Sequence, residues 1–104
     1  MKKIEPDEIR IVGHWVIANG KTVEDEAARR LRELVSGYLV WIASDESGWF
    51  TLYRDPEDGR YWEHGYLQLQ ADSHGGGPPS LIRVDAEHIE ARYGLDRQSP
   101  ELRR

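Results

Sequence analysis

The sequence contains no cysteine, and this absence excludes several kinds of site. A disulfide framework, a thiolate nucleophile, an iron–sulfur cluster and a cysteine-based zinc site all require thiols. Long apolar runs are also missing: the longest extends from Leu39 to Ala43, far short of the ~20 residues of a membrane helix. The chain begins with basic residues, but Glu5, Asp7 and Glu8 replace the apolar stretch of a signal peptide. We therefore expect a cytoplasmic protein that does not bind membranes.

Basic residues are outnumbered: 14 Lys and Arg stand against 19 Asp and Glu, giving a formal net charge of −5. Proteins that bind nucleic acid normally present a concentrated basic face, so direct nucleic-acid binding is not expected. The acidic balance suits solubility, and it also suits a basic protein partner. A chain of 104 residues has room for one domain with one modest core, which excludes a large cofactor domain. We assign this domain to residues 1–94 and expect residues 95–104 to form a frayed tail.

Apolar patterns predict an α+β fold with a mainly antiparallel sheet. Asn19-Gly20 ends the first expected strand, and the strand at 38–43 is apolar on both faces, which favours a central place in the sheet. In the third strand of the meander, Trp62, His64 and Tyr66 alternate with Leu67 and Leu69 on the other face. The expected strands are 9–18, 38–43, 49–54, 60–70 and 81–84.

Two helices are expected. Apolar residues from Val23 to Val35 recur at helical spacing, with Thr22 as the N-cap and Gly37 just past the end, and this long helix should pack on one face of the sheet. A short C-terminal helix should begin after Asp85 and end at Gly94.

Two glycine motifs resemble a phosphate-binding loop and an oxyanion-hole loop, but the neighbouring residues that such loops require are missing. Gly20-Lys21-Thr22 lies between a strand and a helix, but a phosphate-binding loop needs a glycine where this chain has Trp15. The run from His74 to Gly77 matches the oxyanion-hole string of esterases, yet the chain has no G-x-S-x-G nucleophile elbow. We interpret the first motif as a turn and the second as a close backbone approach.

The sequence predicts neither a metal site nor a catalytic group. The four histidines, at 14, 64, 74 and 88, have none of the paired spacings of metal ligands. Glu63 and His64 point to opposite faces of one strand, so they cannot form an acid–base pair. A small hydrolase site formed by Glu63 with a tyrosine or aspartate from elsewhere in the chain stays conceivable. We expect a protein that is not an enzyme and that needs no cofactor.

The aromatic residues exceed what a small core hides. Most should form core contacts and cross-strand pairs, but at least one tryptophan is expected to show a face to solvent, where Trp and Tyr anchor protein interfaces. The residues considered are Trp41, Trp49, Tyr53, Trp62 and Tyr66.

Three strings in fixed order carry a family resemblance: Gly48-Trp49, then LYRDPEDGRYWE from Leu52 to Glu63, then HGGGPPSL from His74 to Leu81. Gly13-x-Trp15 and the helix residues Asp25, Arg29 and Arg30 fit as well. With these residues, the chain resembles the immunity protein 27 family of bacterial polymorphic toxin systems over about residues 8–93.

The resemblance implies a cytoplasmic antidote, active in competition between bacteria, that binds and neutralises a cognate toxin domain by covering its active site with an acidic and aromatic surface. If the toxin is a basic nuclease, carboxylates would occupy phosphate positions. The alternative is a small ligand-binding or regulatory module without catalysis. The candidate toxin contacts are Asp45, Glu46, Glu57, His64 and Tyr66. The remaining motif residues are interpreted as turn and packing residues: Trp15, Trp49, Asp55, Pro56, Asp58, Gly59, Arg60, Trp62, Glu63, Gly75, Gly76, Gly77, Pro78 and Pro79.

Overall fold

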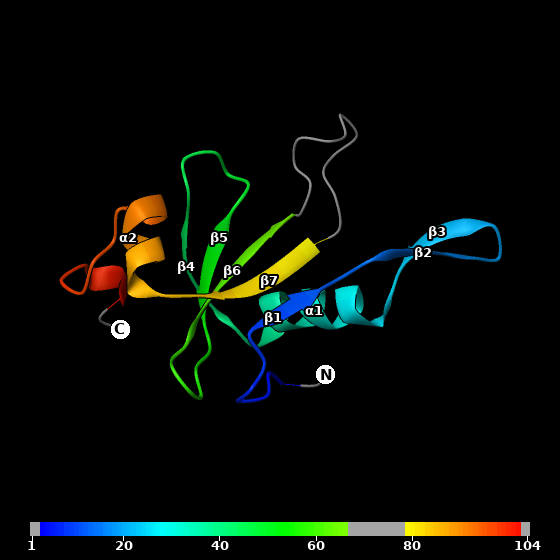
Figure 1. Ribbon diagram of the computed structural model, residues 1–104, viewed down its shortest axis with the longest axis horizontal. Helices are drawn as coiled ribbons and strands as arrows, with labels where there is room; N and C mark the ends of the chain where they lie inside the picture. Colours follow the sequence, from blue (N-terminus) through cyan, green and yellow to red (C-terminus); the bar gives the residue numbers. More distant parts are fainter. Residues whose placement is uncertain (1–2, 67–78, 103–104) are drawn as a thin grey trace.

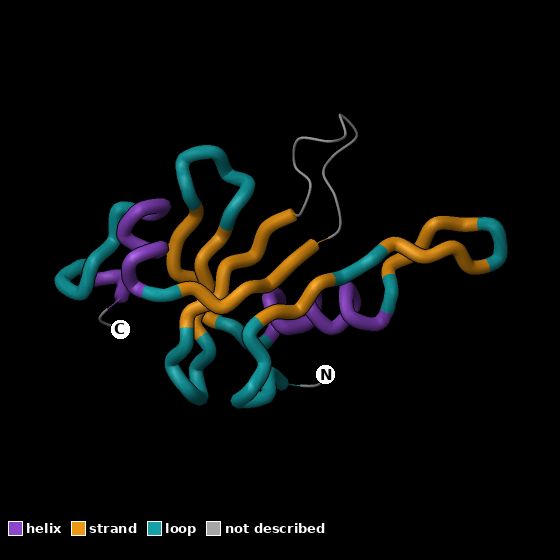
Figure 2. The backbone as a smooth tube through the Cα atoms, viewed as in Figure 1, coloured by secondary structure: helices purple, strands orange, loops and turns teal. Residues whose placement is uncertain are grey.

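The computed structural model describes residues 3–66 and 79–102 as a five-stranded antiparallel sheet, a separate two-stranded hairpin and two α-helices (Figures 1 and 2). The sheet has the strand order β1-β7-β6-β5-β4, and the hairpin pairs β2 with β3. The predicted α+β class, with a meander from β4 to β7, is confirmed. The elements are β1 (Arg10–Val12), β2 (Trp15–Ala18), β3 (Lys21–Glu24), α1 (Glu26–Gly37), β4 (Val40–Ser44), β5 (Thr51–Arg54), β6 (Tyr61–Tyr66), β7 (Pro79–Val84), α2 (Ala86–Tyr93) and a 3₁₀-helix (Pro100–Leu102).

The prediction of one strand over residues 9–18 is wrong, because this segment forms two strands, β1 and β2. Only β1 joins the large sheet, where it pairs with β7. Asn19-Gly20 does not end the extended region but reverses it: both residues have positive φ (53° and 77°), and the chain returns as β3. Asn-Gly is the turn that a tight hairpin favours, because its twist matches that of the strands.

The start of the long helix was also predicted too early. Thr22 lies in β3 opposite Ile17, and the N-cap is Asp25, whose carboxylate accepts the backbone N–H of Ala28. Val23, counted in the apolar stripe, pairs with Val16 in the hairpin instead. The competing β pairing therefore removes the first turn of the expected helix. The short helix α2 is as predicted, with Asp85 as its N-cap and Gly94 in the left-handed conformation at its C-cap.

The strand predicted at the centre of the sheet lies at its edge: β4 pairs only with β5 in the five-stranded order. A register shift between Trp41 and Ala43 marks a bulge, and Ile42 there is buried. Apolar residues lie on both faces of β4 because the residues at the bulge pack toward α2, whereas Trp41 lies on the opposite face beside Tyr53. An edge strand thus resembles a central one in sequence.

The two helices cover opposite faces of the sheet. On one face, Leu31 and Leu34 of α1 pack with Ile11, Trp62 and Leu81. The other face packs Ile42 and Leu52 against Ile89 of α2. Leu95 and Leu102, from the segment predicted to fray, pack against this second cluster, and the Tyr61 hydroxyl donates to the Leu102 carbonyl at 3.3 Å.

Some predictions fall on residues outside the described ranges. These are the end of the strand expected at 60–70 with Leu67 and Leu69, and the motif residues His74, Gly75, Gly76, Gly77 and Pro78. Pro79, predicted as loop, is the first residue of β7. Within the described residues, no helix has the length and apolar character needed to cross a membrane.

Candidate functional site

One face of the sheet is only partly covered by its helix. Helix α1 lies mainly along β1 and β7, at one side of the sheet. Residues directly opposite one another across antiparallel strands share a face, so the pairs Trp41–Tyr53 and Tyr53–Trp62 place all three rings on the α1 face. His64 and Tyr66 follow Trp62 along β6 at intervals of two and share this face as well. An aromatic surface therefore extends beyond the helix toward the edge strand.

We call this surface the aromatic patch and define it as Trp41, Trp49, Tyr53, His64 and Tyr66. The Tyr66 ring meets the Trp49 ring edge-on at 6.4 Å and the His64 ring at 5.4 Å between centroids. Trp41 and Trp49 are 55% and 47% exposed, as expected for at least one tryptophan. Trp and Tyr rings have few rotatable bonds and lose little conformational entropy on binding, which makes half-exposed rings suitable interface anchors.

The aromatic patch is electrically neutral at pH 7. Burial lowers the pKa of His64, so its imidazole is uncharged at this pH. Burial also raises the pKa of Tyr53, with a smaller contribution from Tyr66, so its hydroxyl keeps its proton. Binding through this patch would therefore depend on apolar area and ring contacts, and any electrostatic attraction must come from carboxylates around it.

The predicted acidic contacts lie at two different ends of the sheet. Asp45 and Glu46 belong to the loop between β4 and β5, which also carries Trp49, and β6 brings His64 opposite Thr51 at the same end. Glu57 lies in the turn between β5 and β6, at the other end (Figure 1). The structure thus places four of the five candidates at one end of the sheet and Glu57 at the other. Asp45 and Glu46 line a cavity with Arg92 and Tyr93 of α2, whereas His64 and Tyr66 lie on the α1 face.

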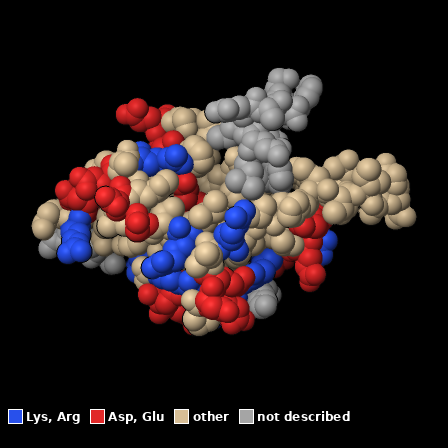
Figure 3. Space-filling model, in the orientation of Figure 1, with Lys and Arg blue, Asp and Glu red and all other residues tan. Residues whose placement is uncertain are grey.

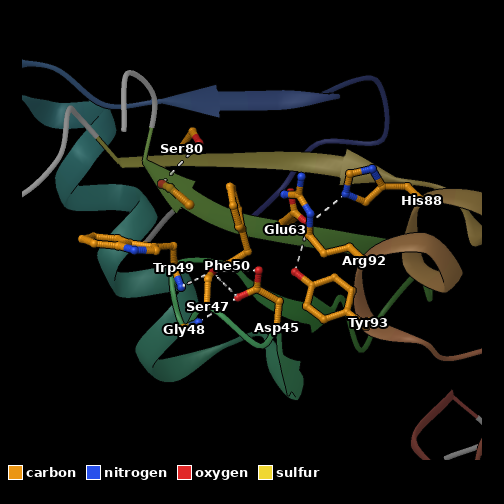
Figure 4. A network of polar contacts seen from close by, with 11 residues as sticks. Asp45, Ser47, Gly48, Trp49, Phe50, Glu63, Ser80, His88, Arg92 and Tyr93 are labelled. Atoms are coloured by element: carbon orange, nitrogen blue, oxygen red, sulfur yellow. Dashed lines mark hydrogen bonds and ion pairs between the residues drawn. The ribbon is translucent and has the colours of Figure 1, made fainter. Parts of the chain in front are cut away.

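The two loop carboxylates differ in what they do. The Asp45 carboxylate accepts the Ser47 hydroxyl at 2.9 Å and the backbone N–H groups of Gly48 and Phe50 at 3.0 and 3.3 Å, so it shapes the loop (Figure 4). Glu46 is exposed at the loop tip. Of this pair, Glu46 is the carboxylate available to a partner.

The motif residues of the β5–β6 turn hold the turn and the N-terminal segment together. Buried Asp55 accepts the Tyr38 hydroxyl at 2.7 Å and the Glu57 N–H at 2.8 Å, and Gly59 supplies a positive φ of 78°. The Arg60 guanidinium donates to the Asp58 carboxylate at 2.7 Å and to backbone carbonyls between residues 5 and 8, and it lies 5.0 Å from the Trp62 ring centre. These contacts shape the turn and attach the N-terminal segment to it.

A second group of polar residues surrounds Glu63 on the α2 face (Figure 4). Its carboxylate contacts His88 Nε2, Arg92 Nη1 and the Tyr93 hydroxyl, each at 2.9 Å, and the Arg92 guanidinium lies 3.9 Å from the Phe50 ring centre. All three partners come from α2. They compensate the burial of the Glu63 carboxylate and attach this helix to the sheet.

The Glu63 group is the nearest approach to the acid–base arrangement left open by the sequence. Burial and the Glu63 carboxylate raise the pKa of Tyr93, so its hydroxyl stays protonated and donates a hydrogen bond rather than acting as a base. The adjoining cavity of about 310 Å³ is lined by Glu63, Asp85 and His88 together with β7 residues. Among the described residues, no group of three or more acidic or histidine side chains is placed to hold a metal ion.

A larger cavity of about 650 Å³ lies between α2 and the C-terminal segment. Tyr61, Ile89, Leu95 and Leu102 give it an apolar lining, and Glu87, Glu90, Asp96 and Arg97 stand around it. The alternative of a ligand-binding module would need polar groups that converge inside such a pocket. Here these charged side chains of α2 and of the following loop are exposed to solvent, and the floor of the cavity is apolar.

Sequence reasoning missed the hairpin of β2 and β3 as an exposed element. We call it the hairpin arm and define it as residues 15–24. Trp15, Val16, Ile17 and Val23 in this arm are exposed large apolar residues. The signal that could have found it is Asn19-Gly20 between two runs of β-forming residues.

The family model of Immunity protein 27 matches residues 17–85, which is more than half of the chain. This chain belongs to the immunity protein 27 family. The resemblance predicted from the sequence is confirmed, and the protein is thereby placed among the immunity proteins of toxin systems. No curated protein and no solved structure matches the chain.

Proposed function

We propose that this immunity protein binds the catalytic domain of a cognate toxin in the cytoplasm of the producing cell and blocks its active site. The proposed contact surface is the aromatic patch together with the exposed carboxylate of Glu46, which lies in the loop that carries Trp49. In this proposal the protein is an inhibitor that performs no chemistry of its own, and family membership supplies the kind of partner.

The observation that carries the proposal is a sheet face that α1 leaves uncovered and that carries half-exposed tryptophans. Trp41 and Trp49 expose about half of their surface on a small domain that buries Trp62 completely. Truncating Trp and Tyr side chains at interfaces costs the most binding energy, because each buries a large rigid surface. An acidic protein with such a surface fits a basic toxin domain, and a basic nuclease is one partner of this kind.

Growth rescue tests the proposal. The toxin domain encoded next to this gene is expressed with and without the immunity protein, survivors are counted, and the two proteins are co-purified. We expect rescue and a one-to-one complex. A lethal toxin domain that this protein neither rescues nor binds would overturn the proposal.

A matched pair of variants then tests the surface. Trp49→Ala removes a patch ring, whereas Glu90→Ala removes an exposed side chain from α2 on the opposite face. We expect Trp49→Ala to weaken toxin binding by at least tenfold and Glu90→Ala by less than twofold, with unchanged circular dichroism. Equal binding of both variants would exclude the aromatic patch as the contact surface.

A further inference from the structure

The hairpin arm projects from the rest of the molecule (Figure 1), and few of its side chains seen in Figure 3 are charged. Ile17 is 80% exposed and Trp15 52%, with Val16 at 42% and Val23 at 38%. An isolated two-stranded hairpin is marginally stable in water, and apolar strands with open edges tend to pair with other chains. We therefore expect another surface to cover this element when the protein acts.

Both faces of the hairpin arm are apolar. Alternation along β2 places Trp15 and Ile17 on one face and Val16 on the other, and Val23 lies directly opposite Val16. A flat partner surface would cover one face and leave the second in water. A cleft can cover both, because its two walls meet the two faces of an inserted hairpin.

The base of the hairpin arm is fixed to the domain. Gly13 donates its N–H to the Pro79 carbonyl at 2.9 Å, and Asp25 and His14 exchange two hydrogen bonds, at 3.0 and 3.1 Å. A Cβ on Gly13 would lie 2.6 Å from the Cβ of Ala28, so the chain passes close against the first turn of α1. An element held in one direction before binding loses less entropy when it binds.

The size and charge of the hairpin arm indicate what it binds. Its four exposed apolar residues offer a few hundred Å², so two arms pairing alone would fall short of the ~1,200 Å² of a stable interface. Lys21 and Glu24 are its only charged residues, which does not match a groove that binds phosphates. A second copy and a strongly basic groove are therefore both disfavoured.

We infer that the hairpin arm inserts into an apolar-walled cleft of the cognate toxin domain, with Trp15 and Ile17 against one wall and Val16 and Val23 against the other. This inference rests on the proposed function and adds a second contact to the aromatic patch. Burial of both arm faces in the toxin would also compensate the exposure of these strands in the free protein.

Three variants test this contact with the toxin domain encoded next to the gene, inactivated by substitution, as the probe. Ile17→Glu and Val23→Lys charge the two faces of the arm, and Ile9→Glu places the same change on an isoleucine that is 62% exposed outside the arm. By isothermal titration calorimetry we expect both arm variants to weaken binding at least tenfold and Ile9→Glu by less than twofold. Circular dichroism and thermal unfolding verify that all three fold.

Each other outcome has a distinct meaning. If the native protein binds the toxin domain and the arm variants bind equally well, the arm inference is overturned while the proposed function stands. Weakening by Ile17→Glu alone would exclude a cleft, since only one face would be in contact. A concentration-dependent dimer of the free protein that Ile17→Glu abolishes in sedimentation would identify a second copy as the occupant. Absence of both rescue and binding by the native protein would overturn the proposed function itself.

Discussion

Two tryptophans on the same face of the sheet have opposite surroundings. Trp41 and Trp62 lie on either side of Tyr53 across three neighbouring strands. Trp62 is completely buried under α1, whereas Trp41 on the edge strand is 55% exposed. The Trp62 indole nitrogen has no hydrogen-bond partner among the described residues, so its contribution to folding comes from packing and from Arg60 at its ring.

We expect Trp62→Ala to lower the free energy of unfolding by about 3–5 kcal/mol, because it removes a large buried ring and leaves a cavity. Trp41→Ala, the matched control on the same face, should cost less than about 1 kcal/mol, mainly the cross-strand contact with Tyr53. Urea unfolding followed by circular dichroism measures both. A stable Trp62→Ala protein that no longer binds the toxin would show that this residue acts in binding rather than in packing.

The limits of sequence reasoning at the residue scale are clearest at Glu63. Its place on a strand, facing away from His64, could be predicted from alternation. Its partners could not, because His88, Arg92 and Tyr93 come from a helix 25 to 30 residues later in the chain. The packing of α2 on the sheet decides these contacts, and no local pattern records it.

At the scale of elements, predictions succeeded where one local signal had no competitor. Helix α2 begins after Asp85 and ends at Gly94 as expected, since no strand of the described residues pairs with that segment. Between Thr22 and Asp25, helical spacing competed with β pairing, and the Asn-Gly turn decided the outcome by bringing Val23 opposite Val16. The edge position of β4 depends on β1 joining the far side of the sheet, which is a long-range contact that strand patterns do not specify.

Asp25 connects two elements, and its role predicts a pH dependence. The N–H of Ala28, and then the N–H and ring of His14, hold the pKa of Asp25 below its ordinary value of 3.8. The stabilising contribution of this carboxylate is therefore complete above pH 3.8 and is lost as the pH falls through the lower pKa of the folded state. Asp25→Ala should cost about 1 kcal/mol at neutral pH, through loss of the helix cap.

Asp25→Asn separates the charge from the hydrogen bond, because asparagine is a good N-cap without a charge. We expect this variant to be less stable than the native protein at neutral pH, with a difference that shrinks as the pH falls below 3.8. Urea unfolding across this pH range measures the difference. A difference that stays constant with pH would show that the carboxylate charge contributes nothing to the folded state.

At the scale of the whole molecule, charge and apolar surface are separated. The molecule extends 50 Å along its longest axis, and the hairpin arm forms one end of it (Figure 1). On the face seen in Figure 3, acidic and basic side chains gather over the body of the domain, and the arm carries few of them. The aromatic patch is neutral as well, so long-range attraction to a basic partner would come from the carboxylates on the body.

Glu46 and Glu57, two exposed carboxylates at opposite ends of the sheet, form a matched pair for testing that attraction. If a basic toxin docks on the aromatic patch, Glu46→Lys should slow association several-fold at low salt and flatten the salt dependence, because rim charges act mainly on the association rate. Glu57→Lys should change the rate little, although it removes surface contacts with Tyr38 and Lys3. Stopped-flow association with the toxin domain at several salt concentrations measures both rates.

A larger effect of Glu57→Lys would place the toxin at the β5–β6 turn. If neither variant changes the rate, shape and buried anchors, rather than charge, direct the encounter.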